Sequence, residues 1–195
     1  QGYDMIVTCY EICFIKKNRS SKVEPCLPEK TSYSFSDLMK SPYSMHMLTF
    51  KTSILANMRR EMLEGVPYTD VEYMLYPTPF VNAIGYCPTV VYRYELGVDD
   101  QTMDWTKFGS NLEAHWKVMS RLASWSKEQL GGLEEEKIRY IAKRIGEMAC
   151  SHIDYCLFCG NHEESELRIQ QLLKLVKDNQ LISDYFNSFP ARYVS

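Results

Sequence analysis

Seven cysteines constrain the fold of this 195-residue chain more than any other feature of its sequence. They are Cys9, Cys13, Cys26, Cys87, Cys150, Cys156 and Cys159. The number is too small for a scaffold built on disulfides alone, yet larger than a cytosolic domain of this size usually carries. Because seven is odd, at least one thiol is unpaired, bonded to another molecule or bound to metal. All seven are therefore candidate disulfide cysteines, and the sequence leaves their pairing open.

Composition and charge exclude several classes of protein. Hydrophobic residues make up 45% of the chain and aromatic residues 13%, which excludes a disordered protein. No apolar run approaches the roughly 18 residues of a membrane-spanning helix. The 25 acidic residues outnumber the 22 basic ones, and no basic block occurs, so we do not expect nucleic-acid binding. Because no phosphate-binding loop, nucleophile elbow or metalloprotease motif is present, we expect no catalytic activity. A thiol-dependent enzyme that uses cysteine and histidine is a third alternative.

Hydrophobic periodicity predicts a mainly α-helical chain. Amphipathic helices are predicted over 44–64, 110–130, 134–159 and 163–177, together with short helices from Thr69 and over 182–189. The apolar run 5–15 is too short to assign to a helix or a strand. Residues 89–95 are rich in β-branched and aromatic side chains and form the best strand candidate. We therefore expect a single domain, 1–195, of five or six helices with at most a short β element near residues 89–95.

The sequence Ile-x-Tyr-Cys occurs twice, around Tyr86 and around Tyr155. Both copies end a stretch that is predicted to be helical, and they lie 69 residues apart. A motif repeated at this distance favours two copies of a helical unit, so we consider pseudo-repeat halves 1–97 and 98–195. The alternative is coincidence, because the chain has 14 tyrosines and seven cysteines.

The densest group of reactive side chains lies between Cys150 and His162. On a continuous helix, His152, Cys156 and Cys159 share one face, and His162 follows directly after a glycine turn. These four residues form a candidate set of tetrahedral zinc ligands. The alternatives are one or two disulfides from this group, or thiols that are buried as small apolar side chains. No cofactor is expected in the leading interpretation, and zinc is the alternative.

Two features near the N-terminus favour secretion. The chain opens at Gln1 without methionine, either because a signal peptide has been removed from a mature chain or because the sequence starts at an arbitrary boundary. Asn18-Arg19-Ser20 is a glycosylation sequon within a polar stretch. Both features agree with an oxidising environment for the cysteines.

The tyrosine–cysteine elements resemble those of the secreted bicycle effectors of gall-forming aphids, which are named for paired cysteine–tyrosine–cysteine motifs. The matching residues are Cys150, Tyr155 and Cys156 for one motif, and either Cys9, Tyr10 and Cys13 or Tyr86 and Cys87 for the other. The resemblance implies an insect virulence protein that is secreted and delivered to a plant host, without known catalysis.

The leading hypothesis is thus a secreted, disulfide-stapled, non-enzymatic effector that binds a host protein. Exposed tyrosines and the loop 97–108 are the expected contact surface. The alternative is an intracellular helical module with a structural zinc at His152, Cys156, Cys159 and His162, which mediates protein or RNA interactions. The segment from Cys156 to Cys159 resembles the opening of a Nanos-type zinc finger, but the later ligands of that finger are absent, so its RNA binding is not carried over.

Overall fold

The computed structural model describes residues 2–40, 43–58, 60–97, 111–129, 131–157 and 161–188. The chain divides into two compact units, each of which draws on two stretches of sequence. The first unit comprises Gln1–Met62 and Tyr73–Gln101, and the second comprises Leu63–Glu72 and Thr102–Ser195. None of the described helices combines the length and the hydropathy that a bilayer crossing requires.

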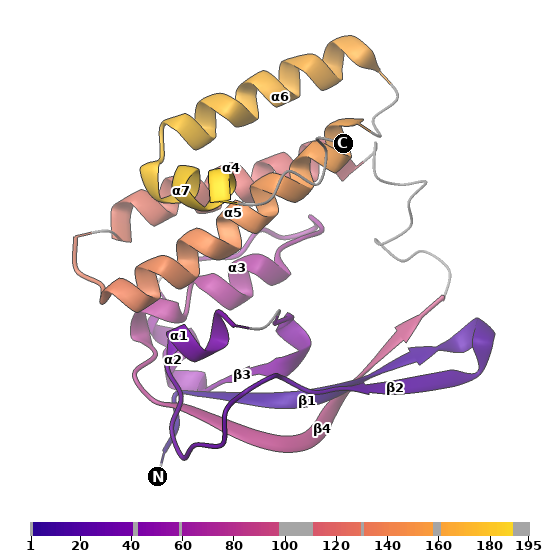
Figure 1. Cartoon of the computed structure of the whole chain (residues 1–195), viewed down its shortest axis with the longest axis vertical. Coiled ribbons are helices and arrows are strands. Elements are labelled where there is room, and N and C mark those ends of the chain that lie inside the picture. Colours follow the sequence, from indigo (N-terminus) through magenta and orange to yellow (C-terminus); the bar gives the residue numbers. More distant parts are fainter. Residues whose placement is uncertain are drawn as a thin grey trace. The chain divides into compact units, whose positions relative to one another are not determined.

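A four-stranded mixed sheet forms the framework of the first unit (Figure 1). Strand β4 (Ile84–Leu96) runs parallel to the central strand β1 (Met5–Phe14) along one of its edges. On the other edge, β3 (Leu48–Phe50) pairs antiparallel with the start of β1, and β2 (Arg19–Val23) pairs antiparallel with its end. The start of β1 is deeply buried, whereas its end forms a three-stranded ribbon with β2 and β4.

Short helical elements connect the strands along the chain. They are η1 (Ile15–Lys17), α1 (Phe35–Leu38), η2 (Met45–Met47), α2 (Thr52–Asn57), α3 (Asp70–Leu75) and η3 (Thr78–Phe80). Helix α1 has a complete capping box, in which Ser34 accepts from the backbone N–H of Asp37 and Asp37 accepts from the backbone N–H of Ser34. This reciprocal pair allows a helix of four residues to form at all.

The prediction of a mainly α-helical fold is wrong, because the chain is α/β. The run 5–15 becomes the central strand β1, and β4 is 13 residues long, although the sequence indicated a strand only near residues 89–95. Gly85 and Pro88 disfavour a strand locally. Pairing with β1, which lies about 80 residues away in sequence, overrides that local preference.

The helix predicted over 44–64 is replaced by η2, β3 and α2. Met47, Phe50 and Ile54 have helical spacing, and all three are buried. However, Leu48 and Phe50 are buried on either side of exposed Thr49, which is the period of a strand. The two periods overlap in this segment, and pairing with β1 selects the strand.

The repeated Ile-x-Tyr-Cys sequence does not mark a structural repeat. Tyr86 lies on strand β4, whereas Tyr155 lies within a helix of the second unit. The two copies therefore have different backbone conformations, and the suggestion of two helical pseudo-repeats fails with the helical fold class.

The second unit contains the four helices α4 (Leu112–Gln129), α5 (Glu135–Leu157), α6 (His162–Lys177) and α7 (Gln180–Ser188). They confirm the helices predicted from residues 110, 134, 163 and 182 onwards. The core consists of apolar side chains from all four helices, among them Val118, Met119, Leu122, Ile141, Ile145, Ala149, Leu172, Val176 and Ile182. The fully buried carboxylate of Glu72 accepts a hydrogen bond from the backbone N–H of Leu63 and pairs with Arg121, which attaches the segment 63–72 to α4.

Substitution of Gly146 tests the close packing of α5 against α7. A Cβ atom at Gly146 would lie 2.9 Å from the Cβ of Tyr185, so α7 would have to move. We expect Gly146→Ala to lower the free energy of unfolding by about 1–3 kcal/mol, although alanine favours helix. Gly132→Ala is the matched control, because a Cβ there meets no atom within 4 Å. Urea denaturation measures both, and equal stability of the two variants would contradict the packing.

Candidate binding surfaces

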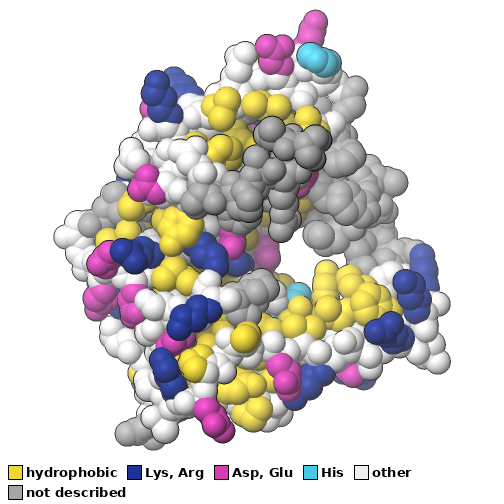
Figure 2. All heavy atoms as spheres, viewed as in Figure 1, with side chains coloured by type: hydrophobic (Ala, Val, Ile, Leu, Met, Phe, Trp, Pro, Cys, Tyr) yellow, Lys and Arg dark blue, Asp and Glu magenta, His cyan; other side chains and the backbone are white. Residues whose placement is uncertain are grey.

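The ribbon of β2, β1 and β4 has one apolar face, which we call the aromatic face. Residues that pair across a ladder lie on the same face, and Tyr10 pairs with both Val23 and Tyr92. The aromatic face consists of Tyr10, Ile12, Phe14, Val23, Tyr92, Tyr94 and Leu96. All of these side chains are partly or largely exposed, and Tyr92 retains 41% of its accessible surface. Figure 2 shows hydrophobic side chains gathered over the ribbon.

His46 of η2 packs on this face. Its ring stacks on that of Tyr92 at a centroid distance of 4.5 Å and an interplanar angle of 14°. It also contacts the rings of Tyr94 at 4.5 Å and Tyr10 at 5.4 Å. Contact with three rings fixes the side chains at the centre of the aromatic face before any partner binds.

A cleft of about 360 Å³ adjoins this group of rings. It is lined by Met45, His46, Leu48, Thr49, Tyr73, Val91 and Tyr92. The hydroxyl of Tyr73 donates a hydrogen bond to the carbonyl of Leu48, and burial raises the pKa of Tyr73. The cleft thus continues the aromatic face with a mainly apolar lining.

The opposite face of the ribbon is polar and internally paired. Glu11 accepts a hydrogen bond from Ser20 at 2.7 Å and forms an ion pair with Arg93 at 3.1 Å. The hydrogen bond from Ser20 is the largest effect on the pKa of Glu11 and lowers it; burial opposes this, and the charge of Arg93 lowers the pKa further. Arg93 also donates to the sulfur of Cys13. Because these groups satisfy one another, this face has less need of a partner than the aromatic face.

The hairpin end of the ribbon is basic. Lys16, Lys17 and Arg19 are exposed there, and Asn18 makes the turn with a left-handed backbone (φ 44°). Lys22 on β2 pairs with Glu24, so its charge is partly neutralised. The sequon asparagine is therefore an exposed turn residue, which is the usual setting of a glycosylation acceptor.

The outer edge of β4 is poorly suited to pairing with another strand. Pro88 lacks the N–H that such a ladder needs, and the register of β4 against β1 shifts on both sides of Cys9. Proline and bulges are the devices by which sheet edges avoid further pairing. The face of the ribbon, and not its edge, is therefore the candidate binding surface.

No disulfide joins any two of the six described cysteines, and Cys159 lies outside the described residues. Cys9 and Cys13 lie on the same strand, where four residues separate their Cα atoms by about 13 Å. A disulfide needs Cα atoms within about 7 Å, so these two cannot pair with each other. The other disulfide pairings stay predictions. In this structure the sulfur of Cys9 lies 3.5 Å from the Tyr86 hydroxyl, and the sulfur of Cys87 contacts the hydroxyl of Thr89.

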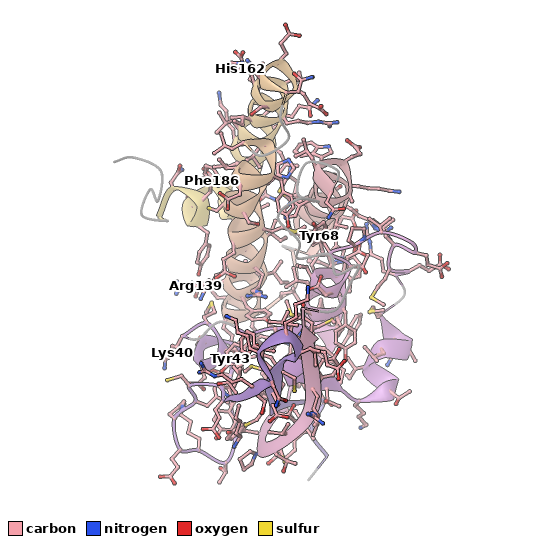
Figure 3. All side chains as sticks on the ribbon, turned by 90° about the vertical axis from the view of Figure 1, so that its right-hand side faces the viewer. Lys40, Tyr43, Tyr68, Arg139, His162 and Phe186 are labelled. Atoms are coloured by element: carbon pink, nitrogen blue, oxygen red, sulfur yellow. The ribbon has the colours of Figure 1, made fainter. Side chains whose placement is uncertain are left out.

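The proposed zinc ligands do not assemble within the described residues, which hold no cluster of three potential metal ligands. His162 is exposed at the start of α6 (Figure 3), whereas His152 is completely buried on α5. His152 pairs instead with His115 of α4, with their Nδ1 atoms 2.9 Å apart. The rings of Tyr68 and Tyr155 pack against His115.

The hydrogen bonds around the histidine pair define its tautomers. The hydroxyl of Ser151 donates to the carbonyl of Met148, so it accepts from Nε2 of His115. Nδ1 of His115 is then the acceptor, and Nδ1–H of His152 donates to it. His115 is thereby neutral, and burial favours a neutral His152 by lowering its pKa. No motif in the sequence indicated that these two residues would meet.

The histidine pair predicts a loss of stability in mild acid. Burial, followed by the charge of His152, lowers the pKa of His115 to about 3; burial, followed by Arg168, lowers that of His152 to about 4. An unfolded chain binds these protons near pH 6.5. The contribution of the neutral pair to the free energy of unfolding is therefore fully present above pH 6.5. It falls as the pH drops towards 4, by up to about 1.4 kcal/mol per pH unit for each imidazole.

Urea denaturation between pH 7 and 4 measures this dependence. His152→Gln should reduce the slope, and His162→Gln is the control that should leave it unchanged, because His162 is exposed. Equal slopes for the native protein and His152→Gln would contradict a neutral buried pair.

Comparison with protein-family models, curated proteins and solved structures gives no match to this chain. The resemblance to aphid effectors therefore stays a prediction. The expected contact loop 97–108 lies outside the described residues except for Gly97. Of the expected exposed tyrosines, Tyr92 lies at the centre of the aromatic face. The partnership of His46 with Tyr10 was missed, since nothing in the sequence links residues that far apart.

Proposed function

We propose that this protein is a non-enzymatic binding protein whose aromatic face binds a partner protein. The observation that carries the proposal is the partial exposure of a continuous apolar sheet face, with Tyr92 at its centre. Exposed apolar patches of this kind are typical of interaction sites. Tyrosine suits such sites because its ring buries a large area at a small cost in conformational entropy.

A protein is favoured over a nucleic acid as the partner. Single-stranded nucleic acids stack their bases on open ring faces. In the aromatic face, His46 already stacks on the ring of Tyr92 and contacts that of Tyr94. The chain is also acidic overall, with a net charge of −3.

The basic hairpin end defines the chemistry of the partner further. Lys16, Lys17 and Arg19 flank the aromatic face at one end. The fitting partner surface has an apolar centre and an acidic border, because opposite charges at the rim of an interface steer association. We expect the partner to be a host protein, and the exposed sequon at Asn18 supports a role outside the producing cell.

Photo-crosslinking identifies the partner and tests the surface together. Benzoylphenylalanine placed at Tyr92 should crosslink one protein in an extract of host tissue, whereas the same probe at Glu95, on the opposite face, should not. With the partner purified, Tyr92→Ser should weaken binding by at least about tenfold, as the loss of a central tyrosine usually does. Glu95→Ser is the matched control on the same strand.

Three outcomes would contradict the proposal. Adducts from position 95 equal to those from position 92 would mean that the face is not selective. Adducts that contain nucleic acid would show that the partner is a nucleic acid and not a protein. Adducts that contain only a second copy of this chain would show that the face is a dimer interface.

The oxidation state of the cysteines tests the extracellular part of the proposal. Protein from its native source, alkylated without reductant and then weighed, should show two or three disulfides. Seven alkylated cysteines would contradict secretion into an oxidising compartment. This result would leave the aromatic face untouched, since no residue of that face is a cysteine.

A further inference from the structure

Helices α4 and α6 run side by side in the same direction and are held together at two places. Near the start of α4, Glu113 forms an ion pair with Arg168 of α6 at 2.6 Å. Just after α6, the buried amide of Asn179 donates to the carbonyl of Ala123 and to the hydroxyl of Ser126. These two attachments set the spacing of the helices along about ten residues of each.

Between the attachments lies a groove of about 360 Å³. Its walls are a stripe of α4 and a stripe of α6 with its C-cap, and it is lined by Trp116, Ser120, Ala123, Ser124, Lys127, Gln171, Lys174, Leu175 and Asp178. The α4 wall is made largely of serine and alanine side chains, which are too small to close the space. The groove is therefore open because the helices are held apart and the side chains between them are small. It exists before a ligand binds.

The lining separates into an apolar part and a cationic part. Trp116 and Leu175 supply apolar surface, and the indole of Trp116 packs on the ring of His152 at 5.6 Å. Lys127 and Lys174 come from opposite walls, and neither ammonium group has an ion-pair partner among the described residues. Ser120, Ser124 and Gln171 offer hydrogen bonds between these two parts.

We propose that this groove binds a small amphipathic organic anion, a site independent of the aromatic face. The apolar body of the ligand lies against Trp116 and Leu175, and its carboxylate lies between Lys127 and Lys174. Asp178 is the one acidic residue in the lining, and it disfavours a second negative charge on the ligand. The ligand class is therefore a monoanion, such as a medium-chain carboxylate.

The size of the groove argues for a small molecule. Sites for small molecules usually enclose about 300–1,000 Å³. A stable protein interface buries at least about 1,000 Å² in total, far more than the nine lining residues of this groove offer.

Titration calorimetry of the whole chain with decanoate tests the proposal, with decan-1-ol as the neutral probe of equal length. We expect decanoate to bind and decan-1-ol to bind at least about tenfold more weakly, because a charge-assisted hydrogen bond contributes that much. Equal affinity for the two probes, or no binding of decanoate at millimolar concentration, would overturn the proposal.

Variants then locate the site. Lys127→Gln and Lys174→Gln should each weaken decanoate binding about tenfold, and Ser124→Leu should abolish it by filling the groove from an exposed helix position. Lys117→Gln, an exposed position of α4 outside the groove, is the charge-matched control, and Tyr92→Ser is the control for the aromatic face. Native affinity in both lysine variants would overturn the proposal, as would loss of binding in either control.

Discussion

Strand β1 can pair along two edges, and the whole first unit depends on how these edges are used. β4 takes one edge along the full length of β1, and this parallel pairing joins Met5 to Ile84 and Phe14 to Leu96. β3 and β2 share the other edge. Parallel neighbours need a long connection, and the residues between β1 and β4 supply it. This connection includes β2 and β3, which occupy the other edge of β1, and the short helical elements that link the strands.

The same pairing produces the two unlike faces of the ribbon. Because side chains alternate along a strand, Tyr92 and Tyr94 lie on one face while Arg93 lies on the other. Arg93 finds Glu11 directly opposite on β1, and the polar face is satisfied within the chain. The rings of Tyr92 and Tyr94 pack on His46, and Tyr92 still keeps 41% of its accessible surface exposed. A binding surface is thus a consequence of the register between two strands.

The second unit places polar groups inside a helical core and pairs several of them with one another or with the backbone. His152 meets His115, Glu72 meets Arg121, and Asn179 meets the backbone of α4. Buried polar groups that are satisfied favour one arrangement of the helices over others that would leave them unpaired. In this unit that selection also sets the spacing of α4 and α6, and with it the groove.

The sequence by itself determined the four helices of the second unit, because their apolar periodicity and capping residues act within a few neighbouring positions. It also indicated the strand character of residues 89–95, and so the alternation that separates Tyr92 from Arg93. The tertiary structure alone decided that residues 5–14 are a strand, that the segment 44–64 is not one helix, and that His115 meets His152. These outcomes depend on partners 37 to about 80 residues away. Contacts across such distances leave no periodic trace in the sequence, and the free energy of pairing outweighs the weak local preference of a short apolar run.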